Sequence, residues 1–328
     1  MRVGGRDARG TLEITSSRCV RVDELAATRL AIGAGILLLA AISDVRTRRV
    51  ADPLWVALGS IGLFVLGIQL LRVQAEISSW ALLGSAAILF YTIFYGAPLF
   101  DEDGFHPRPV RLLSFLAAGA LFVFPAAAHS ASGTGIPQNL LELYSMPVMI
   151  VVYQGFYRAR ILHGGADTKA LIALGLLVPT YPDVSPLPFV TADPRLEGFW
   201  HVAFPFSLVM WVDAAVLFLA VPLALLVWNA IRRDLALPQA LLGYRARLDP
   251  LPPKTWLMEK INDRGDHVLV LFPKRGKDST GDIARLRAAG IDRAWVTPQI
   301  PFMVPLLGGF LLAFFVGNIL LGLLRWLG

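Results

Sequence analysis

The sequence predicts an all-α polytopic membrane protein of about eight transmembrane helices, with a small cytoplasmic α/β insert before the last helix. Two observations lead to this fold class. Of the 328 residues, 55% are hydrophobic and only 16% are charged, whereas about a quarter of the residues in an ordinary soluble domain are charged. In addition, several apolar runs approach or exceed the roughly 18 to 20 residues that a helix needs to cross a bilayer.

The order of segments follows from these runs. Residues 1–25 are expected to form an N-terminal tail, residues 26–231 a transmembrane core, residues 232–298 the cytoplasmic insert and residues 299–328 a C-terminal transmembrane helix. Length and apolarity place the individual spans at 26–43, 54–73, 79–99, 110–128, 141–161, 168–180, 204–231 and 300–326.

Arginine clusters orient the predicted spans. They lie beside spans one, four, five and seven, and the span order puts all of them on one side of the membrane: Arg46, Arg48, Arg49, Arg108, Arg111, Arg158, Arg160, Arg232 and Arg233. Because basic residues are enriched in cytoplasmic loops, this side is predicted to face the cytoplasm. The tail is the exception, since this topology puts its five arginines outside.

The sixth span, residues 168–180, is unusually short. Its 13 residues extend only about 20 Å as a helix before Pro179 and Pro182 interrupt the run. A span of this length lets water reach one of its ends, as broken helices do where they line a polar site.

The insert carries a strand, helix and strand pattern. HVLVLFP (267–273) is typical of a strand, TGDIARLRAAG (280–290) of a helix closed by Gly290, and IDRAWVTP (291–298) of a second strand. This order predicts a βαβ unit. No glycine-rich phosphate-binding loop joins the first strand to the helix, which argues against a dinucleotide cofactor.

Charge and cysteine content exclude several classes of function. The net charge is +6, but Lys and Arg gather beside the apolar runs, which indicates orientation in a lipid bilayer rather than binding to nucleic acid. The single cysteine, Cys19, forms neither an intrachain disulfide nor a paired-cysteine zinc site. Neither a metal nor a cofactor is expected.

Two aspartates at the predicted cytoplasmic edge are the strongest candidates for chemistry. Asp44 ends the first span, and Asp167 begins the sixth. Taken singly, Asp44 could be a helix-end acid paired with an arginine, and Asp167 a helix N-cap. Held close together, two carboxyl groups share a proton, so that one activates water while the other polarises a peptide carbonyl. Gly164 and Gly165 would let the backbone before Asp167 approach the first helix closely.

Three sequence segments resemble the prepilin peptidase family. They are Asp44 with Arg48, Arg49 and the turn at Asp52-Pro53, then GGADTK (164–169), and finally WVTPQIPFMVPLLGG (295–309) ahead of the last span. The similarity is greatest to the archaeal branch, which includes the preflagellin peptidases. The family pattern Gly-x-Gly-Asp reads Gly164-Gly165-Ala166-Asp167 here, with a small alanine in place of the second glycine.

The resemblance implies a membrane-embedded aspartic endopeptidase in the plasma membrane. Such an enzyme removes the short basic leader from type IV pilin-like or archaellin precursors at the cytoplasmic membrane edge. The family's catalytic pair falls on Asp44 and Asp167, with Gly164 and Gly165 supporting the second acid. Lys169 matches the family's lysine, where it either stabilises a developing negative charge or lies at the membrane interface.

An acidic loop offers a further hypothesis on the same predicted side. Asp101, Glu102 and Asp103 would attract the basic residues of a leader, or would form an ordinary solvated loop. Their spacing with His106 matches no closed set of metal ligands. A further acid, Asp213, is expected at the outer interface and is not assigned to the site.

Two rival interpretations remain at this stage. A polytopic transporter or filament-assembly scaffold would use Asp44 and Asp167 to bind a cation or a proton, but the sequence shows no internal inverted repeats. An intramembrane protease of the presenilin type would need Tyr-Asp and Pro-Ala-Leu motifs, which do not occur.

Overall fold

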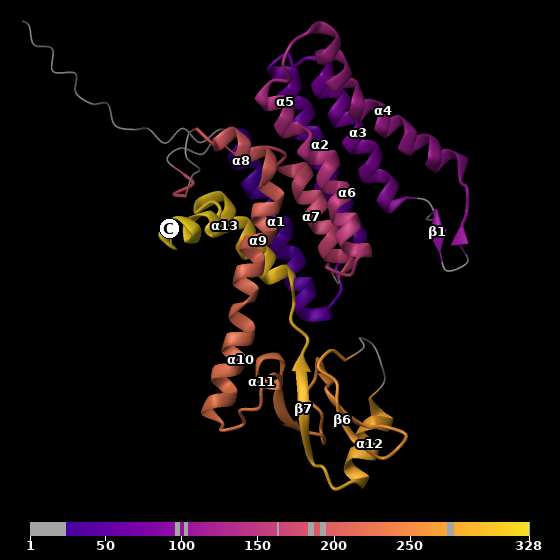
Figure 1. Ribbon diagram of the computed structural model, residues 1–328, viewed down its shortest axis with the longest axis vertical. Helices are drawn as coiled ribbons and strands as arrows, with labels where there is room; N and C mark the ends of the chain where they lie inside the picture. The colour runs from indigo at the N-terminus through magenta and orange to yellow at the C-terminus, as the bar shows by residue number, and fades with distance from the viewer. Residues whose placement is uncertain are drawn as a thin grey trace, which may run out of the picture.

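The computed structural model describes residues 24–95, 99–101, 104–162, 164–182, 187–190, 195–273 and 279–327. The described chain is mostly helical, with a small sheet region near the C-terminus. The helices form a bundle, and the sheet region lies beyond one end of it (Figure 1). Two segments join the parts, namely α10 (Ala220–Ile231) and the connection from β7 (Arg293–Pro298) to α13 (Met303–Phe315). Nearly all of the predicted tail lies outside the described residues.

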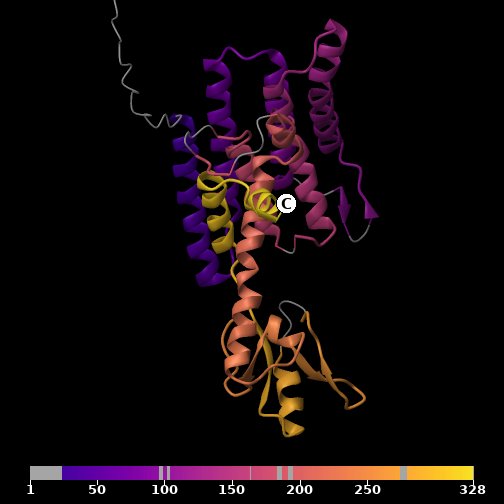
Figure 2. The same cartoon turned by 60° about the vertical axis from the view of Figure 1, so that its left-hand side comes forward.

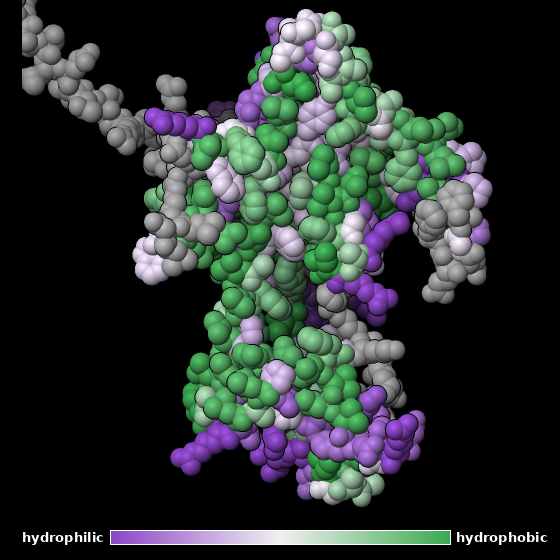
Figure 3. Space-filling model, in the orientation of Figure 1, coloured by the Kyte–Doolittle hydropathy of each residue, from purple (hydrophilic) through white to green (hydrophobic). Residues whose placement is uncertain are grey.

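Five helices in the described part of the chain are long and apolar enough to cross a membrane. They are α1 (Glu24–Thr47), α2 (Asp52–Arg72), α3 (Ile77–Phe94), α4 (Pro109–Ser132) and the run Phe206–Ile231, which comprises α9 (Phe206–Phe218) and α10. This finding supports a multi-pass membrane protein. On the face drawn in Figure 3, hydrophobic residues cover most of the bundle, and hydrophilic residues gather beside and on the sheet region.

The other predicted spans correspond to shorter helices. The fifth is divided between α5 (Gln138–Leu143) and α6 (Ser145–Arg158), and the sixth is α7 (Gly165–Leu177). The prediction of one continuous helix over 300–326 is wrong, because the chain breaks between α13 and α14 (Ile319–Leu327). Gly317 lies at the break with φ +91°, and a side chain there would collide with the carbonyl oxygen of Val190. A positive φ of this kind favours glycine and does not continue a helix.

Helix α7 lies in the middle of the bundle. Its apolar residues are almost completely buried against α2, α6 and α9, as expected for a helix that is hydrophobic on all sides. The crossing with α2 is very close at Gly62, since a Cβ there would lie 2.6 Å from the backbone nitrogen of Leu177. This crossing fixes the C-terminal end of α7, the end opposite Asp167, against the middle of α2.

Helix α13 is packed between α1 and α9. Gly309 lies against the backbone of Met210 and Ala214 in α9, and Gly33 of α1 lies against the ring of Phe310. Small residues at such crossings let the helices approach closely. This packing brings the N-terminus of α13 to the last turn of α1, where Asp44 lies.

The insert, residues 232–298, contains two antiparallel sheets. One has the strand order β3 (Tyr244–Arg247), β7, β4 (Thr255–Leu257), and the other pairs β5 (Glu259–Ile261) with β6 (His267–Leu269). The predicted strand, helix and strand are present as β6, α12 (Thr280–Ala288) and β7. However, β6 and β7 belong to different sheets, so the expected βαβ arrangement is not formed. The strands β3 and β4, which flank β7, have only three or four residues and little alternation, which is why the pattern missed them.

The remaining short elements connect the helices. Strands β1 (Phe100–Asp101) and β2 (Gly104–Phe105) form a hairpin between α3 and α4, α8 (Glu197–Ala203) precedes α9, and α11 (Gln239–Leu242) begins the insert. In the turned view of Figure 2, the insert again lies beyond the bundle, on the continuation of α10. The insert therefore lies at the end of the bundle where α1 ends and α2 begins.

Candidate active site

Asp44 and Asp167 lie at the same end of the helical bundle. Asp44 is in the last turn of α1, and Asp167 is in the first turn of α7. Both side chains are half-buried. Helix α2 contacts both of these helices, and its first residue, Asp52, forms an ion pair with Lys169 of α7. The two segments that resemble the family's signatures are therefore in contact in the fold.

The Asp44 carboxylate meets the N-terminus of α13. Its Oδ2 accepts a hydrogen bond from the backbone N–H of Met303, the first residue of α13, at 3.2 Å. The first N–H groups of a helix have no partner within the helix, so this one is free to bind a carboxylate. After Asp44 the chain turns sharply, since Arg48 has φ +56° and its N–H bonds to the carbonyl oxygen of Asp44 at 2.9 Å.

The surroundings of Gly164 and Gly165 differ. A Cβ on Gly164 would collide with the carboxyl group of Asp167 itself. Gly165 has more room. The atom nearest to a Cβ added there would be the hydroxyl oxygen of Tyr157 in α6, at 3.6 Å. Gly164 therefore leaves space for the Asp167 carboxyl to fold back over the start of α7. The close approach of this glycine pair to the first helix stays a prediction.

Lys169 bridges the two signature segments. Its Nζ lies 2.6 Å from Oδ2 of Asp52 and 5.3 Å from the ring centroid of Phe94 in α3. The Lys169 side chain is 25% exposed and the Asp52 side chain 56% exposed, so the pair contributes little to stability. Its geometric effect is larger, because it ties the first turn of α7 to the first turn of α2.

Part of the predicted acidic loop lies outside the described residues. Glu102 and Asp103 are among the residues left out, and Asp101 is described only by its backbone pairing with Gly104. Leader docking by this loop remains a prediction. In the described ranges, no group of three or more His, Cys, Asp or Glu side chains is arranged to hold a metal ion.

A groove of about 580 Å³ opens between α3 and α4 near the same end of the bundle. It is mostly apolar, with polar groups at its rim: Tyr91, Thr92, Tyr95, Arg108, Arg111 and Ser114. Neither Asp44 nor Asp167 lines it. The groove is thus separate from the two acids.

The structure corrects the expectation for Asp213. Instead of lying at an interface, its side chain is fully buried, and Oδ1 accepts the backbone N–H of Ile319 at 3.2 Å. Ile319 is the first residue of α14, so the acid binds the helix that follows the break at Gly317. An acid inside an apolar run was the available signal, but its partner lies 106 residues away.

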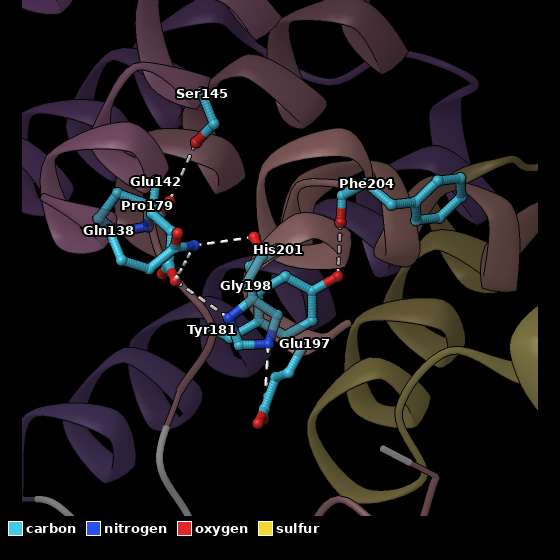
Figure 4. A network of polar contacts seen from close by, with 9 residues as sticks. All are labelled: Gln138, Glu142, Ser145, Pro179, Tyr181, Glu197, Gly198, His201 and Phe204. Carbon is cyan, nitrogen blue, oxygen red and sulfur yellow. Dashed lines mark hydrogen bonds and ion pairs between the residues drawn. The ribbon is translucent and has the colours of Figure 1, made fainter. Parts of the chain in front are cut away.

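The opposite end of the bundle carries a polar network that the sequence did not indicate (Figure 4). His201 of α8 lies 3.0 Å from Glu142 of α5 and stacks on the ring of Tyr181 at 3.9 Å. Gln138 donates to the carbonyl oxygen of Gly198 at 2.8 Å. These contacts fasten α8 to α5 far from the two aspartates. Only the spacing of Glu197 and His201, four residues apart on a helix, could have been noticed in the sequence.

Comparison with known proteins gives two matches. Residues 236–319 match the family described as Archaeal Peptidase A24 C-terminus Type II. The chain is also similar to a preflagellin peptidase from Methanocaldococcus jannaschii, with 27% identity over 183 residues that cover 53% of this chain and 71% of the relative.

Both findings support the resemblance to the archaeal preflagellin peptidases that the three sequence segments indicate. They support a protease in a multi-pass membrane protein. The family match at 236–319 spans most of the insert and all of α13. These are the segments that reach the last turn of α1 beside Asp44.

Proposed function

We propose that this protein is a membrane-embedded aspartic endopeptidase with Asp44 and Asp167 as its catalytic pair. It removes the short basic leader from type IV pilin-like or archaellin precursors at the cytoplasmic edge of the plasma membrane. The observation that carries the proposal is the meeting of the two signature segments at one end of the bundle, through the Lys169–Asp52 ion pair. The similarity to a preflagellin peptidase supports the substrate class.

In the proposed reaction, the two carboxyl groups share the acid and base work. One carboxylate accepts a proton from water as the water oxygen attacks the carbonyl carbon of the scissile peptide. The other, protonated carboxyl donates a hydrogen bond to the carbonyl oxygen. The carbon–nitrogen bond then breaks, and a proton passes to the leaving nitrogen. The products are a leader with a new carboxylate and a mature subunit with a free amine.

The position of the acids suits such a substrate. A precursor of this class carries its basic leader in the cytoplasm and an apolar helix in the membrane, so the scissile bond lies at the membrane edge. Asp44 and Asp167 are half-buried at an end of the bundle that also carries the arginine clusters. Water is available at such a depth, and charge there costs much less than at the bilayer centre.

The acidic loop of Asp101, Glu102 and Asp103 is proposed to attract the leader. Reversal of these three charges to Lys should weaken binding, which would raise KM for a basic-leader precursor and make cleavage less sensitive to salt. Unchanged processing by the triple variant would remove this part of the proposal.

The deciding experiment measures cleavage of a basic-leader precursor in membranes that contain the full chain. Asp44→Asn and Asp167→Asn should each lower the rate by about 100-fold or more, since each removes a proton donor or acceptor. Glu24→Gln is the matched control, because Glu24 is an exposed acid at the far end of the same helix as Asp44. Cleavage that survives both aspartate changes would contradict the protease and favour the transporter or scaffold interpretation.

A further inference from the structure

Lys254 of the insert contacts the end of α1 that carries Asp44. Nζ of Lys254 donates to the carbonyl oxygens of Val45 at 2.6 Å and Arg46 at 3.2 Å. These are the two residues directly after Asp44. The last carbonyls of a helix lack partners within the helix and carry the negative end of its dipole, so a cation there is well placed to bind them. Lys254 thus caps α1 from more than 200 residues away in the sequence.

The backbone around Lys254 is held as well as its side chain. The lysine has φ +56°, a left-handed conformation that is uncommon for a residue other than glycine. Such conformations persist where the surrounding structure enforces them, and they cluster at functional sites. Here the preceding turn is closed by the Thr255 hydroxyl, which donates to the carbonyl oxygen of Pro252 at 2.6 Å. The turn directs the lysine toward α1.

The same lysine is connected to the other group that binds Asp44. The backbone N–H of Gln299 donates to the carbonyl oxygen of Lys254 at 2.8 Å. Gln299 lies on the short connection from β7 to α13, four residues before Met303, whose N–H binds the Asp44 carboxylate. The last turn of α1 is therefore held at two points: its backbone by Lys254, and the acid's side chain by the start of α13.

We propose that Lys254 is a positioning residue for Asp44, and that the insert acts through it as a clamp on the catalytic end of α1. The proposal rests on the proposed function, because it assigns Asp44 a catalytic role. Lys254 binds the backbone carbonyl oxygens that follow Asp44, and not its side chain, in the hydrogen bonds of the described residues. It acts by fixing the turn from which the carboxylate projects, and small displacements of a reacting group reduce the rate strongly.

The test compares three variants of the full chain reconstituted in lipid vesicles with a synthetic basic-leader precursor. Lys254→Met keeps the length of the side chain but removes its donors, and it should lower kcat by roughly 10- to 100-fold with little change in KM. Lys254→Arg keeps donors at this position and should restore a large part of the rate. Lys260→Met, in β5 of the same insert, is the matched control and should behave like the wild type.

A second measurement separates this proposal from the proposed function. Hydrogen exchange of the backbone over residues 42–48 should speed up in Lys254→Met and not in Lys260→Met, whether or not the precursor is cleaved. A wild type that leaves the precursor intact, or an Asp44→Asn variant that still cleaves it, would overturn the catalytic role of Asp44. A Lys254→Met variant with wild-type kcat, or one whose loss is matched by a fall in thermal stability, would overturn the clamp alone.

Discussion

The two ends of the helical bundle are fastened in different ways. At the end opposite the insert, the network of His201, Glu142 and Tyr181 is largely shielded from solvent, with the His201 and Glu142 side chains 20% and 15% exposed. At the insert end, Asp52 and Lys169 are 56% and 25% exposed, and both candidate catalytic acids are half-buried. Shielded contacts suit a structural fastening, whereas a hydrolytic site must admit water and a peptide. Substitutions at the opposite end should therefore change stability, and those at the insert end should change the reaction.

Gly164 provides the strongest test of this comparison. Gly164→Ala would push a methyl group into the Asp167 carboxyl, so precursor cleavage should fall by about 100-fold while the thermal midpoint changes little. Gly165→Ala is the control, since its new methyl group would be in ordinary contact with Tyr157. The measurement is the initial cleavage rate of both variants. Equal cleavage rates for the two alanine variants would show that the reaction does not depend on the folded-back position of the Asp167 carboxyl.

The Lys169–Asp52 ion pair should have an intermediate effect. Lys169→Met or Asp52→Asn should each reduce cleavage by roughly tenfold but cost less than about 1 kcal/mol of stability, because the pair is partly exposed. The exchange Asp52→Lys with Lys169→Asp tests whether the contact itself is needed. Recovery of activity in the exchanged variant indicates alignment of α7 with α2, and a persistent loss indicates that Lys169 acts on the substrate.

At the opposite end, His201→Ala should lower stability without lowering kcat. The change removes the hydrogen bond to Glu142 and the stacking on Tyr181, and the loss should be about 1 to 3 kcal/mol. Glu197→Gln is the matched control, and it should lower the stability by less than about 0.5 kcal/mol. The Glu197 side chain is 48% exposed and lies 3.8 Å from the histidine. Unfolding in detergent measures both. A large loss of kcat in folded His201→Ala would mean that the two ends are coupled.

Asp213 should show the smallest effect of the set. Asp213→Asn keeps an oxygen for the N–H of Ile319, so its stability should stay within about 1 kcal/mol of the wild type. Asp213→Ala removes the acceptor and should loosen α14, which hydrogen exchange at Ile319 and Gly322 would detect. If Asp213→Asn abolishes precursor cleavage in a folded protein, Asp213 belongs to the reaction and the assignment of Asp44 with Asp167 must be revised.

Much of the architecture could be predicted from local sequence. The apolar runs predicted the order of the helices, and α2, α3 and α4 begin within two residues of the expected spans. The strand, helix and strand of the insert were also recognised by their patterns. The strand pairing was not, because β7 pairs with β3 and β4 through contacts that span many residues, and these short strands have little pattern of their own.

The sequence by itself determined the membrane character of the chain, the order of its helices and the resemblance of three segments to the archaeal peptidases. Composition and periodicity are local properties, and motifs are short. Only the tertiary structure decided the break at Gly317, the burial of Asp213, the reason for Gly164 and the contacts of Lys254 and Met303 with the end of α1. Each of these depends on a neighbour brought close by folding, as when a backbone N–H of α13 meets the carboxylate of Asp44, 259 residues earlier.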